Sequence, residues 1–532
     1  MLQKIVIKNF KCYETFSLDF NADINIIVGD NEAGKSTLLE AINLALTGRV
    51  AGRPVQSEIS PHLFNQSSAK KYIEEINEGA NPLQPEIIID VFIKKDSETA
   101  HLAGTNNLDK VDTPGIRLRI AYNDEYADEY NAFIATKTAT TIPVEYYKVE
   151  WLSFSGNPIT QRGIPIAASM INAANIRLQN GADYYLQKII KGHLTDQQRT
   201  ELSRAYRDLK QTFTSNASIS AINDILDKAK GEVSDKTFTL GIDVSQQSGW
   251  ESGLVPHLDD LPFTLIGSGE QSTMKILLAI NRRIEESHAI LIEEPENHLS
   301  FATLNKLISK IEDKCRERQV IITTHNSYVI NKLGIGKLIL LHEQQAAKMT
   351  DLPDTTQDYF MKLSGYDTLR LVLARETIIV EGPSDELVVQ RAYMDTHDGR
   401  LPIHDGIDVL NARGLSSKRF LEIAAQLGKP VHVVTDNDGK PDAVDKKFED
   451  FTTYDNISIH RSDDAALPSL EDHIFALNGR EKMNRILGKS FSDDASALAH
   501  MKKDGNKTTG AVAIFGATEV VTMPEYILDA IK

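Results

Sequence analysis

The chain has 532 residues, which predicts more than one domain because a single core rarely grows past about 250–300 residues. A composition of 41% hydrophobic and 25% charged residues is typical of a soluble globular protein, and a net charge of −17 excludes a generally cationic surface. Nucleic-acid binding would therefore need local basic patches or bridging metal ions. The two cysteines, Cys12 and Cys315, form no C-x-x-C pair. With no signal peptide and no membrane-spanning run, we expect a cytoplasmic protein.

The first half opens with two segments of alternating polarity, 4–10 and 16–20, which predict a β pair. An apolar strand then leads into Gly29-Asp30-Asn31-Glu32-Ala33-Gly34-Lys35-Ser36, and a helix follows. This is the G-x-x-x-x-G-K-S loop in its strand–loop–helix setting. Backbone N–H groups would wrap the phosphates of ATP, Lys35 would reach the β- and γ-phosphates, and Ser36 would ligate Mg²⁺.

A later apolar strand ends on two acids, Glu293 and Glu294. Glu293 would hold the Mg²⁺ through water, and Glu294 would position the attacking water. Ser268 and Gly269 open another predicted helix and would form a second phosphate-binding tip. A further strand ends on His325, which is placed to sense the γ-phosphate; an ordinary buried histidine is the alternative.

Taken together, these motifs resemble the ATP-binding-cassette ATPases of the SMC and RecF type. The resemblance implies a head-to-head homodimer with ATP between the heads, and it matches 267–271 to the signature and 296–299 to the D-loop. Glu293 stands where the family has an aspartate, which lengthens the metal ligand. Gln84 and Gln161 are both candidates for the glutamine of the family's Q-loop, and the sequence does not decide between them. The expected nucleotide-site residues are Asn31, Gly34, Lys35, Ser36, Thr37, Ser268, Gly269, Glu293 and His325, with Glu294 as the catalytic acid.

Helix-friendly sequence interrupts this ATPase domain, dividing it into 1–163 and 236–350. The insertion, 164–235, lacks long heptads, which excludes an SMC-like coiled-coil arm and favours a compact dimerisation element. An insertion without such a role is the alternative. A polar stretch at 351–370 predicts a linker, and 371–532 form the second domain. Helices are expected within the insertion at 183–191, 196–213 and 219–230.

Strands at 377–380, 407–410 and 430–434 alternate with helices in the second domain. This order predicts a small parallel α/β sheet whose ligands collect at the carboxyl ends of the strands.

Acidic residues follow two of these strands. Glu381 and Asp385 come after the first strand, and Asp436 and Asp438 come after the third. Residues two apart on a strand point to the same side, so Asp436 and Asp438 would present their carboxylates together. Glu471, at the start of a later helix, is placed to complete the set. Such an oxygen-lined pocket suits Mg²⁺ or Mn²⁺.

This half resembles the TOPRIM domain of topoisomerases, primases and OLD-family nucleases. The resemblance matches the hallmark glutamate to Glu381 and the DxD motif to Asp436 and Asp438. It matches Asp385 and Glu471 to acids that OLD-type domains add, and segment 506–513 to the lysine segment. Lys507 would then neutralise charge on the scissile phosphate, unless it is an ordinary solvent-facing lysine. The order of the domains points to the OLD (overcoming lysogenization defect) family, whose members include anti-phage effectors.

The expected protein is an ABC-type ATPase domain with a helical insertion, followed by a Rossmann-like TOPRIM domain. We expect an ATP-regulated, divalent-metal-dependent DNA endonuclease with two metal ions. Its expected partners are DNA and a second copy of the chain, and a partner protein or nucleic acid from a defence operon is left open. The alternatives are a topoisomerase-type reaction through a tyrosine, a RecF-like clamp or loader with a non-catalytic TOPRIM domain, and RNA as the cleaved strand.

Overall fold

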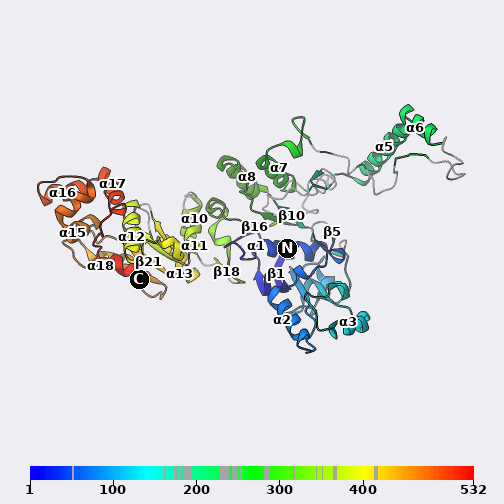
Figure 1. Ribbon diagram of the computed structural model, residues 1–532, viewed down its shortest axis with the longest axis horizontal. Helices are drawn as coiled ribbons and strands as arrows, with labels where there is room; N and C mark the ends of the chain where they lie inside the picture. Colours follow the sequence, from blue (N-terminus) through cyan, green and yellow to red (C-terminus); the bar gives the residue numbers. More distant parts are fainter. Residues whose placement is uncertain are drawn as a thin grey trace. The chain divides into compact units, whose positions relative to one another are not determined.

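A computed structural model defines the fold (Figure 1). It describes residues 1–50, 53–160, 163–166, 168–172, 178–179, 182–183, 194–227, 239–242, 250, 255, 257–280, 288–314, 318–342, 344–349, 352–362, 368–412 and 417–532. Contacts divide the chain into two compact units, which are considered separately below. The first comprises 1–27, 34–324 and 343–345, and the second comprises 28–33, 325–342 and 346–532.

An antiparallel sheet opens the chain, and its strands run in the order β2-β1-β6-β8-β7, with β9 paired to β8. The predicted pair at the N-terminus is confirmed, because β1 and β2 are antiparallel neighbours. Apolar side chains of β1 such as Ile5 and Ile7 are fully buried. The strands are β1 (Leu2–Phe10), β2 (Tyr13–Asp19), β6 (Ile87–Ile93), β7 (Ala103–Gly104), β8 (Thr113–Tyr122) and β9 (Tyr147–Ser153).

A second sheet carries the nucleotide motifs, in the order β10-β15-β16-β3-β17-β18. The neighbours β10, β15, β16 and β3 are parallel, so their carboxyl ends meet at one edge. Strand β10 falls inside the predicted insertion 164–235, whose beginning is therefore part of this sheet rather than helical. The strands are β3 (Ile24–Gly29), β10 (Ala168–Asn172), β15 (Ala289–Glu293), β16 (Gln319–Thr323), β17 (Leu338–His342) and β18 (Gln345–Lys348).

Helices begin where the sequence places the phosphate-binding motifs: α1 starts at Lys35 and α7 starts at Ser268. Of the helices expected in the insertion, α5 and α6 are present, and the one predicted at 183–191 lies almost wholly outside the described residues. The helices are α1 (Lys35–Thr47), α2 (Gln66–Asn77), α3 (Ala127–Ile134), α5 (Asp196–Thr214), α6 (Ala217–Asp227), α7 (Ser268–Ile280), α8 (Phe301–Lys314) and α9 (Ser327–Leu333). Short strand pairs complete this part: β4 (Arg49–Val50) with β5 (Arg53–Pro54), β11 (Leu178–Gln179) with β12 (Ala182–Asp183), and β13 (His257–Leu258) with β14 (Leu261–Pro262).

The predicted linker at 351–370 contains helix α10 (Asp354–Lys362) and the start of α11 (Thr368–Leu373). Beyond it, a four-stranded sheet has the order β20-β19-β21-β22, and all its pairs are parallel. This confirms the small parallel sheet expected from the sequence. Its elements are β19 (Glu376–Val380), α12 (Pro383–Thr396), β20 (Ile407–Asn411), α13 (Ser417–Leu427), β21 (Val431–Val434), α14 (Pro441–Phe448) and β22 (Ile457–His460).

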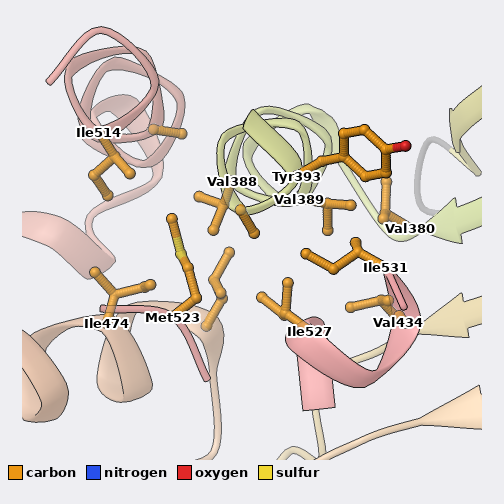
Figure 2. Packing of buried hydrophobic residues seen from close by; sticks show 14 of the residues in the cluster. Val380, Val388, Val389, Tyr393, Val434, Ile474, Ile514, Met523, Ile527 and Ile531 are labelled. Atoms are coloured by element: carbon orange, nitrogen blue, oxygen red, sulfur yellow. The ribbon is translucent and has the colours of Figure 1, made fainter. Parts of the chain in front are cut away.

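Four C-terminal helices follow the sheet: α15 (Leu470–Leu487), α16 (Asp494–Lys502), α17 (Asp504–Phe515) and α18 (Glu525–Ala530). Helix α18 packs against β21 and β22, α17 packs against α12, and α15 and α16 pack against α17. Figure 2 shows Val388 of α12 on the side of the core opposite Ile514 of α17 and Ile474 of α15, with Ile527 and Ile531 of the C-terminal segment below α12. The buried Arg391 of α12 donates to the carbonyl oxygens of Phe515, Ala517 and Glu519 at the end of α17. Helices α12 and α17 are therefore fixed to each other by both apolar and polar contacts.

None of the helices that the structure describes has the length and apolarity required to cross a membrane.

Candidate active site

The parallel sheet of the second unit brings two acidic segments to one edge. In the order β20-β19-β21-β22, strand β20 is added on one side of β19 and the later strands on the other, so the strand order reverses between β19 and β21, which is where open α/β sheets bind ligands. Glu381 follows β19 directly, and Asp436 lies two residues beyond β21. The buried Thr435 connects these segments, because its hydroxyl donates to Oε1 of Glu381. The carboxylate of Glu381, which follows β19, is thus oriented by Thr435, which follows β21.

Asp438 lies in a turn that follows β21. The buried Asn437 fixes this turn by donating from Nδ2 to the carbonyl oxygens of Ser462 at 3.1 Å and Asp464 at 2.9 Å. Asp438 itself has a φ of 49°. The alternation argument for Asp436 and Asp438 is therefore wrong, because the strand ends at Val434 and strand periodicity does not extend into the turn. Asp436 is half-buried, whereas Asp438 is exposed.

The remaining acids come from helix starts. Asp385, in the first turn of α12, accepts a hydrogen bond from the backbone N–H of Gly382 at 2.9 Å and so caps that helix. Glu471, in the first turn of α15, lies 3.7 Å from Nζ of Lys507 on α17, and its side chain is only 12% exposed. The neighbouring Asp472 instead pairs with Lys502 at 2.8 Å. Each of two lysines therefore compensates one acid at the start of α15.

Electrostatic coupling shows that these acids are neighbours. Burial, followed by the charges of Asp385, Glu381 and Glu471, raises the pKa of Asp436 from 3.8 to about 8. Burial also raises the pKa of Asp385 to about 6, with Glu381 and Glu471 adding to the rise and the Gly382 N–H and Lys507 opposing it. The site consequently holds more negative charge than its lysines compensate.

A divalent cation fits this donor set by its chemistry, because the ligands are all carboxylate oxygens and the excess charge is negative. Within the part of the chain that the structure describes, however, no three His, Cys, Asp or Glu side chains converge closely enough to hold an ion as they stand. The acids are therefore coupled without forming a ready-made ligand shell, and ion binding would require side-chain rotation.

In the first unit, Gly34 ends the phosphate-binding loop in the left-handed region, with a φ of 95°, and α1 begins directly after it. The Tyr13 hydroxyl donates to the Gly34 carbonyl at 3.1 Å, which fixes the loop from β2. Lys35 is buried, with 7% of its surface exposed, while Ser36 and Thr37 lie in the first turn of α1. This strand–loop–helix geometry is the one that phosphate-binding loops require.

The other predicted nucleotide residues lie at the ends of β15 and β16 and at the start of α7. Glu293 ends β15, and Glu294 has a φ of 46° while its carboxylate accepts from Nδ2 of Asn297 at 2.7 Å. A Cβ at Gly269 would lie 2.3 Å from the carbonyl oxygen of His298, so a glycine is needed there. Ser268 and Asn31 are exposed, and His325 is half-buried two residues beyond β16. Of the two Q-loop candidates, Gln84 precedes β6 and Gln161 lies outside the described residues.

Sequence reasoning missed two residues of the second site, Thr435 and Tyr526. Thr435 stands directly before the acidic motif, a position that could have marked it. Tyr526, on α18, is 8% exposed and stacks edge-on against His473. Burial and the carboxylates of Asp436, Asp385, Glu471 and Glu381 raise the pKa of Tyr526. No local sequence motif marks Tyr526 as a site residue, because tertiary packing alone brings α18 near the acids.

Fold and site together define a chain with two enzyme domains: an ATPase domain followed by a TOPRIM domain of the nuclease type. Residues 1–330 match the family described as AAA ATPase domain, and residues 372–438 match the overcoming lysogenization defect protein-like TOPRIM domain. The first match covers more than half of the chain, so the chain belongs to this ATPase family, and the second match gives it the domain order of the OLD family. ATPase and TOPRIM domains generally use a nucleotide and divalent metal ions, respectively.

Comparison with individual proteins adds relatives of the ATPase domain. The chain is 30% identical over 113 residues to structural maintenance of chromosomes protein 6 of Saccharomyces cerevisiae, covering 20% of this chain and 10% of that protein. It is 22% identical over 382 residues to an ATP/GTP phosphatase of Helicobacter pylori, covering 67% of this chain and 93% of that protein. Among solved structures, an SMC head bound to the C-winged helix domain of ScpA is similar, at 15% identity and a TM-score of 0.34, covering 65% of this chain and 96% of that one.

Proposed function

We propose that this protein is an ATP-regulated, divalent-metal-dependent endonuclease that cleaves DNA. The observation that carries the proposal is the group of coupled acids at the edge of the second sheet. Burial, followed by the charges of Asp385, Glu381 and Glu471, raises the pKa of Asp436 to about 8, so its ionised form is disfavoured in the absence of a counter-charge. Bound Mg²⁺ or Mn²⁺ would replace the proton and supply this counter-charge.

The residues proposed to hold the ions are Glu381, Asp385, Asp436, Asp438 and Glu471. When bound, two such ions would supply an activated water and charge stabilisation for the leaving oxygen. Thr435 orients the Glu381 carboxylate by its hydrogen bond. Lys507, whose Nζ lies 3.7 Å from Glu471, would neutralise charge that develops on the scissile phosphate. Asp472 and Lys502 position the start of α15.

The ATPase domain would act as a conformational gate. Lys35, Ser36 and Glu293 would bind ATP and its Mg²⁺, and Glu294 would position the hydrolytic water. The proposed contacts Asn31, Gly34, Thr37 and His325 complete the site, and Ser268 and Gly269 of a second copy would close over the nucleotide. ATP binding would then shift a homodimer between states that differ in how DNA reaches the acids. A role in anti-phage defence, with a partner from the same operon, is the setting that the OLD-like domain favours.

Two other functions use the same domains. A topoisomerase-type reaction needs a tyrosine nucleophile that can reach DNA, but Tyr526 near the acids is buried, with 8% of its surface exposed. A RecF-like clamp would need no intact acid set, whereas this chain retains all five acids. The observations therefore favour hydrolysis over either alternative.

Plasmid cleavage in Mg²⁺ or Mn²⁺, with and without ATP, tests the proposal. Asp436→Ala should lower the cleavage rate at least about 100-fold and leave ATP hydrolysis unchanged, because an essential ligand is removed. The matched control is Asp442→Ala, which removes an exposed acid on α14. Lys35→Ala should abolish ATP hydrolysis and remove the ATP dependence of cleavage. Cleavage by Asp436→Ala at the wild-type rate would refute the site, and a DNA–protein adduct on a denaturing gel would favour the topoisomerase alternative.

A further inference from the structure

Helix α9 and the linker helices α10 and α11 lie in the second unit, together with the sheet that carries the acids. His325, which is proposed to contact the nucleotide, stands two residues before the first residue of α9. The residue between them, Asn326, caps this helix, because its side chain accepts from the backbone N–H of Tyr328 at 2.9 Å. A displacement of His325 would therefore move the start of α9.

A buried hydrogen bond joins α9 to α11. The hydroxyl of Thr368 on α11 donates to Oδ1 of Asn331 on α9 at 2.8 Å, and both residues are 0% exposed. Helix α9 packs against α10 as well as α11. A Cβ at Gly336, which follows α9, would lie 2.5 Å from Oε1 of Gln357 on α10, so little space separates these segments. Because close-packed segments transmit displacement, movement of α9 would reach the linker helices.

Helix α11 is in turn fixed to β20, the edge strand of the second sheet. Arg370 of α11 forms a two-point ion pair with Asp408 of β20, in which Nε of Arg370 lies 2.8 Å from Oδ2 of Asp408. The same guanidinium donates to the carbonyl oxygen of Val409 at 3.0 Å. A two-point pair fixes orientation as well as distance, so β20 would follow a movement of α11.

Strand β20 ends beside the acidic site. Its last residue, Asn411, donates from Nδ2 to the carboxylate of Glu386 on α12, and Glu386 is the neighbour of Asp385. Within the part of the chain that the structure describes, Oδ1 of Asn411 is buried and has no hydrogen-bond partner. An unsatisfied buried acceptor raises the free energy of this arrangement, which favours a second position of β20 or α12 that supplies a donor.

We propose that ATP controls the acidic site through a path that runs from His325 through α9, α11 and β20 to α12. The inference rests on the proposed nuclease function and names the elements that regulate it. The contacts of Thr368 with Asn331 and of Arg370 with Asp408 stand in series, so loss of either one uncouples the acids from the nucleotide. Coupling between two sites usually changes an equilibrium about 5–150-fold, so ATP should change the cleavage rate of the wild type at least about fivefold.

The first test compares Thr368→Val and Arg370→Gln with Arg400→Gln, using the full chain. Arg400 pairs with Asp405, and both lie in the segment between α12 and β20, so the control breaks an ion pair that does not involve α11. In both path variants the ratio of cleavage rates with and without ATP should fall to within about twofold of 1. ATP hydrolysis should stay within about twofold of the wild type. Arg400→Gln should keep the wild-type ratio, and the double variant should resemble each single path variant.

Hydrogen exchange with and without ATP gives a readout that does not depend on cleavage. ATP should change exchange of the β20 amides at 407–411 at least about fivefold in the wild type and in Arg400→Gln. In Thr368→Val the response should remain in α9 and be lost in α11 and β20. In Arg370→Gln it should remain in α9 and α11 and be lost in β20 alone. Arg370 is 38% exposed, so its replacement tests the path even if Thr368→Val does not fold.

A β20 response to ATP that persists in Arg370→Gln, or that is absent from the wild type, would overturn the inference. In either case ATP-dependent DNA cleavage by the wild type would still support the proposed nuclease. A wild type that cuts no DNA, but whose β20 response is present and is lost in Arg370→Gln, would refute the nuclease and support the path. The two proposals can therefore fail separately.

Discussion

Asp436→Asn should stabilise the metal-free protein at alkaline pH. The pKa of Asp436 in the folded chain is about 8 against an ordinary value of 3.8, so the folded state binds more protons than the unfolded state between these values. Stability therefore falls as the pH rises from about 4 to about 8, and the full penalty is present above pH 8. The rise in pKa corresponds to ~6 kcal/mol. Because coupled acids share protons, we expect at least ~2 kcal/mol to be recovered by the uncharged amide.

Thermal unfolding in EDTA measures this effect. For a domain of 150–250 residues, 1 kcal/mol shifts Tm by about 2–4 °C, so Asp436→Asn should unfold at least about 5 °C above the wild type at pH 8.5. The difference should shrink to within about 1 °C only near pH 3, where Asp436 is protonated in both the folded and the unfolded wild type. Mg²⁺ should raise the Tm of the wild type only, because binding stabilises the folded state. Equal Tm values at pH 8.5 in EDTA would refute the raised pKa of Asp436 and the cost of ionising it in this buried, acidic site; Asp442→Asn is the control.

Two further substitutions test the supports of each site. Arg391→Leu leaves Asp395 without its partner at 2.9 Å and removes the donor to the carbonyl oxygens at the end of α17, so it should cost ~3 kcal/mol of stability and slow cleavage. The control, Arg400→Leu, breaks a more exposed pair and should cost less than ~1 kcal/mol. Similar losses of Tm in the two variants would contradict the role assigned to Arg391. Gly269→Ala places a Cβ 2.3 Å from the His298 carbonyl oxygen and should reduce ATP hydrolysis more than tenfold. Gly267→Ala, whose Cβ would have no heavy atom within 4 Å, should not reduce it to this extent. Equal hydrolysis rates in the two variants would count against the close approach of Gly269 to His298.

Local patterns were sufficient for the parts of the fold that depend on short segments. The strand–loop–helix at Lys35, the helix start at Ser268 and the parallel sheet behind Glu381 all follow from apolar runs bounded by turn residues. The position of Glu471 at a helix start was likewise predictable, because Ser469 precedes it as a capping residue. Each helix or strand in these predictions spans fewer than about 15 consecutive residues, so its local sequence largely determines it.

Features that depend on tertiary packing could not be predicted. The turn at Asp438 is fixed by Asn437, whose partners lie more than 20 residues away, so strand periodicity gave the wrong direction there. The Glu381 carboxylate is oriented by Thr435 from a different strand. Strand β10 joins the ATPase sheet from within a stretch whose composition favours helices. In each case a distant contact overrides the local preference.

Cleavage in this chain would depend on how α17 is anchored, because the position of α17 determines where the Lys507 ammonium group lies. Its distance of 3.7 Å from Glu471 is longer than a hydrogen bond, so that contact alone does not fix the ammonium group. The far end of α17 is instead anchored by Arg391, which lies on the same helix as Asp385. One helix therefore sets the positions of an acid of the proposed metal site and, through α17, of the lysine opposite it. A shift of α12 along its axis would move both groups together, which makes α12 the element through which a conformational change could switch the site.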